Sequence, residues 1–362
     1  MNTNKKKISG LVLFTIAMVI HFYSYSKLRV EQGYSGQFFP AFGRALRSFS
    51  GKIPFSVGDL LYGILFLWLA WLLVKLLRFF ASKRQRRQWK EQLTGTAWNV
   101  FIVLCSVYII FNIFWGINYN RKGIAWQLGL KEEKYSIEDI KLLNCLLIDK
   151  VNASKKQLME AKRNYPQNKQ LFSMVEDAYA NIAKTYPFLN YGPASIKPGI
   201  WKNIQSYTGI TGYYNPFTGE AQLNTQVPKF VQPYTACHEV AHQLGYAKEM
   251  EANFVGYLAA AASTDTLLHY SVYFDLFLYA NRNLFFADSA TAKLYRKELL
   301  PQVVDDIKEW RDFNLKHQSF LEPIVRFVYG HFLRRNEQPQ GLQSYDEVTG
   351  FLIAYYKKFG KL

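Results

Sequence analysis

The segment HEVAHQLGYAKEMEANF, residues 238–254, contains two histidines four residues apart with a glutamate directly after the first. Residues i and i+4 share one face of an α-helix, so His238 and His242 can direct their imidazole nitrogens at one point. This HExxH pattern is typical of a helical zinc site. Three residues after His242 stands Gly245, where a left-handed helix C-cap would turn the chain. The segment therefore predicts two helices joined by a tight turn, with a metal site between them.

Glu239 is the candidate catalytic residue of this segment. In HExxH sites the glutamate faces the water that zinc coordinates, whose pKa zinc lowers to about 7. Glu239 would accept the proton as general base while the hydroxide attacks a polarised carbonyl. A catalytic zinc usually has three protein ligands and one open position, so the two histidines need a third partner.

The third ligand is expected in the helix that begins near Lys248, which offers Glu249 and Glu251. These two residues differ by about 200° of helical rotation, so only one of them can face the metal. We favour Glu249, because Asn253 follows it at i+4 and can hold a ligand side chain in place. Glu251 is the alternative ligand.

Two other interpretations of the motif stay open. The segment can be an ordinary charged helix or a set of core histidines, although HExxH arises by chance only about 0.004 times in a chain of this composition. It can also be a zinc site that has lost its catalytic role. Cys237 precedes His238 but points about 100° away from it on a helix, so we expect it to pack in the core rather than bind metal.

The residues HEVAHQLG followed by EMEAN resemble the gluzincin metallopeptidases, in which HExxH precedes a helix bearing ExxxD or ExxxN. This resemblance implies that His238, His242 and Glu249 bind Zn²⁺, that Glu239 is the base and that Asn253 supports a ligand. The chain departs from gluzincins in the gap of six residues between His242 and Glu249, and in having Asn at 253. Together with the hairpin GYYNPFTGEAQLN and three apolar segments, the motif also resembles an uncharacterised bacterial family of membrane-anchored proteins.

Three apolar segments, at about 8–25, 53–74 and 97–118, are predicted to span a membrane. Crossing a hydrocarbon core of about 30 Å takes about 20 residues, which each segment approaches or reaches. The first follows three lysines, as a cleaved signal peptide also would. No small-x-small cleavage site follows it, so an uncleaved anchor is favoured.

The positions of the basic residues predict the orientation of these spans. Residues 1–117 carry 15 Lys/Arg and 3 Asp/Glu, so the basic excess lies beside the apolar segments. This placement fits anionic lipid headgroups better than nucleic acid, and no nucleic-acid partner is expected. The loop between the second and third spans should be cytoplasmic; its basic residues are Arg78, Lys83, Arg84, Arg86, Arg87 and Lys90.

The loop between the first and second spans is also basic, which weakens the difference in charge between the two loops without reversing it. Its basic residues are Lys27, Arg29, Arg44, Arg47 and Lys52. Three spans that start inside place residues from about 121 onward outside the cytoplasm. Trp115 and Tyr119 are then expected to anchor the outer end of the third span at the lipid interface. The predicted division is a membrane domain, 1–120, and one extracytoplasmic domain, 121–362.

The second domain is predicted to be mainly helical, an α+β zincin-like fold. Helical periodicity covers 136–183, and Pro233 is expected in the first turn of the motif helix. Further helices are expected at 252–262, 267–280, 290–315, 323–333 and from about 345. The aromatic run at 267–280 contains His269 and Asp275 and is short, so it predicts a buried core helix rather than a fourth span.

Residues 209–224, just before the motif helix, predict a β-hairpin from their Asn-Pro and Thr-Gly signals. An edge strand here, 209–214 or 220–224, can pair with an extended peptide. The alternative is a purely structural hairpin. Candidate substrate-contacting side chains are Tyr213, Tyr214 and Phe217.

The candidates for stabilising a developing oxyanion are Tyr345, His331 and Arg282, and the sequence does not choose among them. The three cysteines form no metal-ligand pattern and imply no disulfide framework. One pair, Cys145 with Cys237, can form if the second domain is exported.

The function expected from these residues is that of a multi-pass protein of the bacterial inner membrane. It would act as a zinc-dependent metallopeptidase or related amide hydrolase on peptide or protein substrates of the cell envelope. The alternative is a catalytically silent binding or scaffold protein that keeps the zincin fold.

Overall fold

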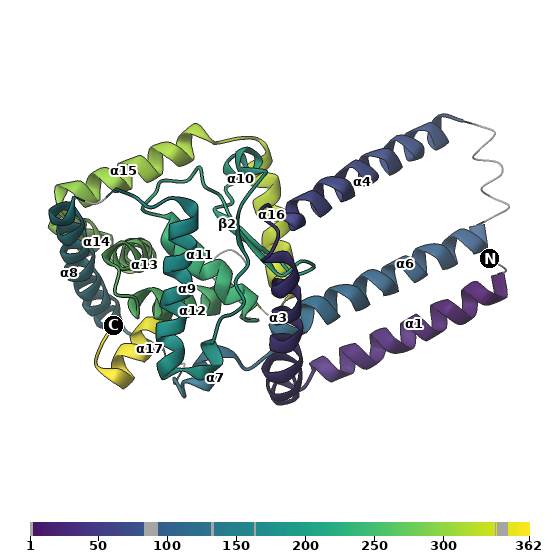
Figure 1. Ribbon diagram of the computed structural model, residues 1–362, viewed down its shortest axis with the longest axis horizontal. Helices are drawn as coiled ribbons and strands as arrows, with labels where there is room; N and C mark the ends of the chain where they lie inside the picture. Colours follow the sequence, from purple (N-terminus) through teal and green to yellow (C-terminus); the bar gives the residue numbers. More distant parts are fainter. Residues whose placement is uncertain (1–2, 83–92, 132–133, 163, 337, 339–346) are drawn as a thin grey trace.

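Three long helices project together from one side of a mainly helical body in the computed structural model, which describes residues 3–82, 93–131, 134–162, 164–336, 338 and 347–362 (Figure 1). They are α1 (Thr3–Ser24), α4 (Val57–Ala81) and α6 (Leu93–Phe114). Each is long and apolar enough to cross a membrane. The three predicted apolar helices are therefore confirmed.

Local capping explains where these helices differ from the predicted bounds. The second begins at Val57 rather than 53, because the Ser56 side chain caps it by accepting a hydrogen bond from the backbone N–H of Asp59. The third ends at Phe114, where the chain enters a short 3₁₀ helix, η2 (Gly116–Asn120). The predicted basic residues between 83 and 90 lie outside the described residues.

The segment between α1 and α4 packs against the C-terminal body, which comprises the described residues from 116 onward. It forms α2 (Lys27–Arg29), a π-helix η1 (Val30–Phe38) and α3 (Phe39–Ser50). Arg47 of α3 is buried and donates hydrogen bonds to the backbone carbonyls of Pro193 and Gln243, at 2.9 and 3.0 Å. Arg47 thus joins the part before residue 120 to the part after it. The division into two domains at residue 120 stays a prediction.

Trp115 and Tyr119 do not face lipid, which corrects the sequence-based expectation. Both are buried in a cluster with Phe39. The Trp115 ring packs 4.9 Å from that of Tyr214 and 5.9 Å from that of His242. Aromatic side chains such as these can lie either at a lipid interface or in a protein core. Here they lie in the core, because they pack against the body.

The C-terminal body is built from helices around one apolar core. Its first helices are α7 (Gly123–Gln127), α8 (Ile137–Ala161), α9 (Asn168–Thr185), η3 (Pro187–Leu189) and α10 (Lys202–Tyr207). The predicted helical stretch 136–183 is thus two helices separated by a break that contains Pro166. The long helix α13 (Thr266–Ala287) packs along α8 with most of its side chains buried, which confirms a core helix at 267–280.

The C-terminal part continues with shorter helices. The predicted helix at 290–315 is broken, because Pro301 begins a new helix and its ring excludes a continuous one. In its place stand α14 (Ser289–Tyr295), η4 (Arg296–Glu298) and α15 (Pro301–Lys316). The chain then forms α16 (Leu321–Arg335) and α17 (Val348–Phe359).

A three-stranded sheet lies between the membrane-side helices and the motif helix. It contains β1 (Ile196–Pro198), β2 (Gly212–Asn215) and β3 (Glu220–Leu223) in the order β1-β3-β2. β2 and β3 are antiparallel, with Gly212 opposite Leu223, and form the predicted hairpin. β2 lies at an edge of this sheet and β3 lies between β1 and β2, so the predicted edge strand at 209–214 is confirmed and the alternative at 220–224 is wrong. β1 pairs in parallel with β3 and was not predicted.

The motif segment forms the two predicted helices, α11 (Gln232–Gln243) and α12 (Glu249–Ala261). Pro233 lies in the first turn of α11, and Gly245 has the expected left-handed backbone, with φ of +88°. The helices approach closely at Gly256, where an added Cβ would lie 3.1 Å from the His238 backbone nitrogen. Cys237 is buried as expected, and it and Cys145 are free thiols rather than a disulfide.

A buried ion pair joins the first loop to this turn. The Arg121 guanidinium donates two hydrogen bonds to the Glu31 carboxylate, at 2.7 and 3.0 Å, and a third to the Gly245 carbonyl at 3.1 Å. Burial alone would raise the pKa of Glu31, but Arg121 and the backbone N–H of Gly123 outweigh it and hold that pKa below its ordinary value of 4.5.

We expect Glu31→Ala to lower the free energy of unfolding at pH 7 by about 3–5 kcal/mol, because it leaves the Arg121 charge buried without its partner. Since the folded pKa of Glu31 lies below 4.5, the pair stabilises the fold fully above pH 4.5 and loses its effect as the pH falls through the folded value. Chemical denaturation of the full chain in detergent between pH 7 and pH 3 measures this.

The matched control is Asp305→Ala, which removes an exposed ion pair with Lys308 and should change stability little. A difference between wild type and Glu31→Ala that does not shrink toward low pH would show that the carboxylate charge is not what stabilises this junction.

Candidate metal centre

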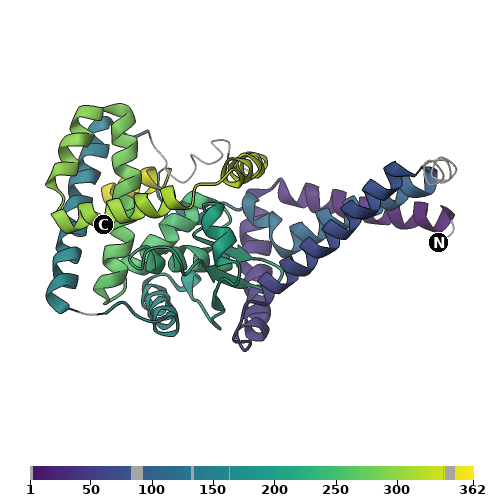
Figure 2. The same ribbon diagram turned by 90° about the horizontal axis from the view of Figure 1, so that it is seen from above.

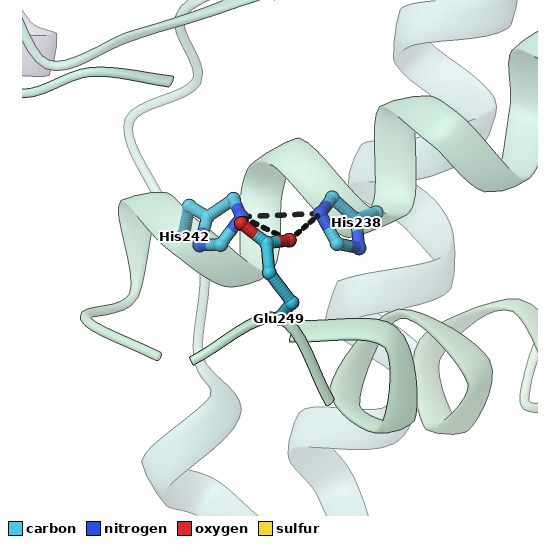
Figure 3. Close-up of side chains that lie close together, drawn as sticks. All are labelled: His238, His242 and Glu249. Carbon is cyan, nitrogen blue, oxygen red and sulfur yellow. Dashed lines mark hydrogen bonds and ion pairs between the residues drawn. The ribbon is translucent and has the colours of Figure 1, made fainter. Parts of the chain in front are cut away.

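Three potential ligand atoms converge between α11 and α12 (Figure 3). The Nε2 atoms of His238 and His242 lie 3.1 Å apart. Glu249 is the first residue of α12, and its Oε2 lies 3.2 Å from Nε2 of His238 and 3.6 Å from Nε2 of His242. All three side chains are largely buried. The turn at Gly245 thus brings the carboxylate to the face of α11 that carries both imidazoles.

This donor set fits a tetrahedral zinc ion. Three atoms that each lie about 2.0–2.1 Å from such an ion are separated by roughly 3.3–3.4 Å, close to the separations of 3.1, 3.2 and 3.6 Å that the structure shows. Two imidazole nitrogens and one carboxylate oxygen are also a donor combination that catalytic zinc sites use. Among the described residues this is the group of His, Cys, Asp and Glu side chains suited to hold a metal.

Neighbouring groups fix the orientation of two of these ligands. Nδ1 of His242 lies 2.7 Å from the backbone carbonyl of Tyr246, an arrangement that directs Nε2 toward the cluster. The Tyr329 hydroxyl, from α16, donates a hydrogen bond to Oε1 of Glu249. One carboxylate oxygen is therefore held by Tyr329, while the other faces the histidines.

The charges of the cluster are strongly coupled. Burial would raise the pKa of Glu249, but hydrogen bonds from His238 and His242 hold it well below its ordinary value. Burial likewise lowers the pKa of His242, yet the Glu249 carboxylate reverses this and raises it to about 9. The buried Glu249 carboxylate thus attracts positive charge, which a protonated histidine or a metal cation can supply.

Glu239 lies beside this cluster and faces the edge strand β2. An added Cβ at Gly212 would lie 2.8 Å from Oε1 of Glu239, so the glycine gives the carboxylate room against the strand. Burial raises the pKa of Glu239 to about 7. Its Oε2 is buried and makes no hydrogen bond within the described part of the chain. A buried carboxyl group of this kind can exchange a proton near neutral pH.

Glu251, the alternative third ligand, points to the other side of α12. An added Cβ at Gly123 would meet its carboxylate, and its charge raises the pKa of Arg121. Asn253 is buried on the same wall of the site as Glu249, one turn later. The geometry therefore brings Glu249, and not Glu251, to the two histidines.

The cluster lies in a cavity of about 730 Å³ between the body and the apolar helices. Strand β2 and the following turn line one wall, including Tyr213, Tyr214 and Phe217, the predicted substrate-contacting residues. Tyr62 of α4 and Phe111 of α6 line the side toward the apolar helices. The site is thus enclosed by both parts of the chain.

The three residues predicted as candidates for stabilising an oxyanion differ in their position relative to the cavity. Arg282 lines the cavity. His331 is exposed on α16, where its Nδ1 lies 3.0 Å from the carbonyl of Phe327, and it is not part of the cavity wall. Tyr345 lies outside the described residues. Of the three, Arg282 is the one that the described structure places at the site.

Tyr329 and Asp275 lie at the site and were not among the residues predicted for it. Asp275 of α13 lines the cavity, and burial raises its pKa to about 7 although the His238 charge acts in the opposite direction. Asp275 is the acidic residue of the largely apolar run 267–280. An acidic residue in such a run could have been recognised from the sequence as a candidate site residue. Tyr329 is one of 25 tyrosines, and nothing in its local sequence distinguishes it.

No curated protein and no solved structure matches this chain. A protein-family model does match, over residues 34–353, which covers α3, both remaining apolar helices and the candidate metal centre. Its description is Protein of unknown function (DUF3810), and the chain belongs to this family.

Proposed function

We propose that this protein is a zinc-dependent peptidase or related amide hydrolase with a zincin-like domain, anchored in the bacterial inner membrane. The observation that carries the proposal is the convergence of His238, His242 and Glu249 in one cavity with Glu239. The gluzincin-like order of these residues supports it independently. The proposed ligands are His238, His242 and Glu249.

The roles of the side chains follow from their positions. Zinc, when bound, supplies a Lewis acid that polarises a carbonyl and acidifies water. Glu239 accepts a proton from the attacking water and later delivers it to the leaving amine. Its pKa of about 7 suits both steps near neutral pH. Arg282, at the cavity wall, is the proposed partner for negative charge that develops on the carbonyl oxygen.

A polypeptide substrate fits the shape of the site. β2 is an edge strand whose residues line the cavity, and it passes directly beside Glu239 at Gly212. An extended peptide can pair with such an edge through main-chain hydrogen bonds. The substrate would then lie across the proposed metal, with Tyr213 and Tyr214 beside it.

The second candidate function is a catalytically silent binding or scaffold protein. The buried Oε2 of Glu239 favours the enzyme, because a buried carboxylate oxygen with no hydrogen bond in the described chain is costly in a purely structural role. Such a group is expected where it exchanges protons with a bound water or substrate.

The packing of the first loop supports the proposed topology. The residues between α1 and α4 contact the C-terminal body, so both must lie on the same side of a membrane that the apolar helices cross. With the lysine-rich N-terminus inside, that side is extracytoplasmic.

The purified full chain should contain about one zinc per molecule, measured by elemental analysis after dialysis. We expect His242→Ala and Glu249→Ala to lose the metal, and Glu251→Ala to keep it. The full chain is needed because Glu31 and Arg47 pack into the body. Folded protein that takes up no zinc on addition, or metal loss in Glu251→Ala but not in Glu249→Ala, would contradict the assignment.

Glu239→Gln should lower the rate of peptide hydrolysis by about 10²–10⁴-fold, because the side chain loses its proton-accepting oxygen. Zinc content should stay unchanged. The assay uses a mixed library of fluorogenic peptides with the full chain in lipid nanodiscs, and the exposed Glu309→Gln serves as control. Equal activity in both variants would remove Glu239 from the mechanism.

A reporter enzyme fused after residue 130 should be active only outside the cytoplasm. A second fusion within residues 83–92 should report the cytoplasm, because these residues precede α6 in the chain and residue 130 follows it. Cytoplasmic activity of the first fusion would overturn the orientation.

A further inference from the structure

The outer surface of α16 carries a row of exposed apolar side chains. Phe320 is 79% exposed and Phe327 66% exposed, and Ile324 and Val328 lie with them at helical spacing. On α10, Ile204 is exposed, and so is Trp201 at its N-cap. We call these six residues the α10–α16 face. A contiguous apolar face of this kind marks an interaction site.

The α10–α16 face is continuous with the apolar helices. Nε1 of Trp201 donates to the carbonyl of Asp59 at 2.9 Å, and its ring would contact a Cβ added at Gly63, both in α4. The Ser319 hydroxyl, just before α16, donates to the carbonyl of Tyr207 at 2.6 Å, which joins the two short helices.

The other end of α16 packs against α6. The Phe332 ring lies 6.0 Å from that of Phe111. In Figure 1, α16 accordingly lies on the side of the body from which α4 and α6 project.

Helix lengths set the level of this face relative to a bilayer. α4 has 25 residues, and the hydrocarbon core takes about 20. Lys75 and Arg78, in the last two turns of α4, have side chains long enough to reach headgroups on the cytoplasmic side. Gly63, against which Trp201 packs, lies within the first two turns of α4 and therefore near the opposite boundary between hydrocarbon and headgroups. Tryptophan is enriched at this boundary, where its ring is partly apolar and its N–H stays hydrogen-bonded.

Basic residues accompany the apolar ones. Lys202 of α10 and Arg334 and Arg335 of α16 are exposed. A helix with aromatic and aliphatic residues on one face and arginines beside them is suited to lie in the plane of a membrane that contains anionic lipids.

We propose that the α10–α16 face rests in the headgroup layer of a phospholipid bilayer. This placement rests on the proposed membrane location of the apolar helices. The opposite side of α16 carries Tyr329, which lines the cavity together with Tyr62 of α4 and Phe111 of α6. The cavity therefore lies at the level of the lipid surface, and the proposed substrate is a polypeptide segment held at the membrane, such as the juxtamembrane part of an anchored protein. The bilayer also holds in place the helix that supplies Tyr329 to Glu249.

Photocrosslinking to lipid tests the face without any assay of hydrolysis. Phe327 and Ile324 are each replaced by p-benzoylphenylalanine in the full chain, reconstituted in liposomes of phosphatidylethanolamine and phosphatidylglycerol. Leu67 of α4, 69% exposed, is the positive control. Phe286, 80% exposed in the last turn of α13, is the negative control. α14, which follows directly in the chain, lies on the side of the body away from the apolar helices (Figure 1). Irradiated protein is analysed for lipid adducts by mass spectrometry.

We expect lipid adducts at 324 and 327 at least about tenfold above those at 286, because an interfacial helix buries its apolar face roughly 5–10 Å into the headgroup boundary. Adducts at Leu67 alone would overturn the inference and leave the membrane location standing. Absence of adducts at Leu67 as well would overturn both. Crosslinks from 327 to a polypeptide would show that a protein covers the face, and would also overturn the inference.

Discussion

The buried ion pair between Arg121 and Glu31 is the contact on which the arrangement of the site depends. Arg121 follows α6 and η2, Glu31 follows α1, and the same guanidinium donates a hydrogen bond to the carbonyl of Gly245 in the turn between α11 and α12. Because all three meet at one side chain, the two apolar helices and the turn cannot shift independently. A charge this deeply buried specifies geometry more than it adds stability, since desolvation offsets much of its attraction.

The second apolar helix is tied to the body by a different interaction. Both oxygens of Glu220, at the start of β3, accept hydrogen bonds from the first backbone N–H groups of α4, at 3.1 and 2.6 Å. A carboxylate at a helix N-terminus satisfies otherwise unpaired donors and the helix dipole together. The sheet that presents β2 to the cavity is thus fixed to α4, and Figure 2 shows the apolar helices leaving the body as one group.

Sequence alone could predict the elements whose cause is local. The helical spacing of His238 and His242, the helix start at Pro233 and the glycine at 245 each act within a few residues, and the structure has α11, the turn and α12 where they were expected. The apolar helices and the β2–β3 hairpin could be predicted from sequence for the same reason. The strand β1 was not, because three residues ending in Pro198 form a strand only by pairing with β3.

What sequence could not predict is contact between distant segments. Helical rotation showed that Glu249 and Glu251 cannot both face the histidines, and Asn253 at i+4 favoured Glu249. Where the Glu251 side chain goes instead, beside Gly123 and Arg121 on the far side of α12, could be learned only from the fold. Trp115 and Tyr119 have the composition of a lipid interface and are buried instead, because the first loop folds over them. Tyr329 reaches Glu249 across 80 residues.

These distant contacts share one feature, which is that they come from the apolar helices or the segments beside them. Tyr62 and Phe111 close one side of the cavity, and α16, which closes another, packs against Phe111. In a domain attached to apolar helices by a flexible linker, those helices would fix only its location. Here the apolar helices form part of the cavity wall, so the shape of the cavity depends on how they pack. The part of the fold that carries the apolar helices therefore also shapes the candidate site.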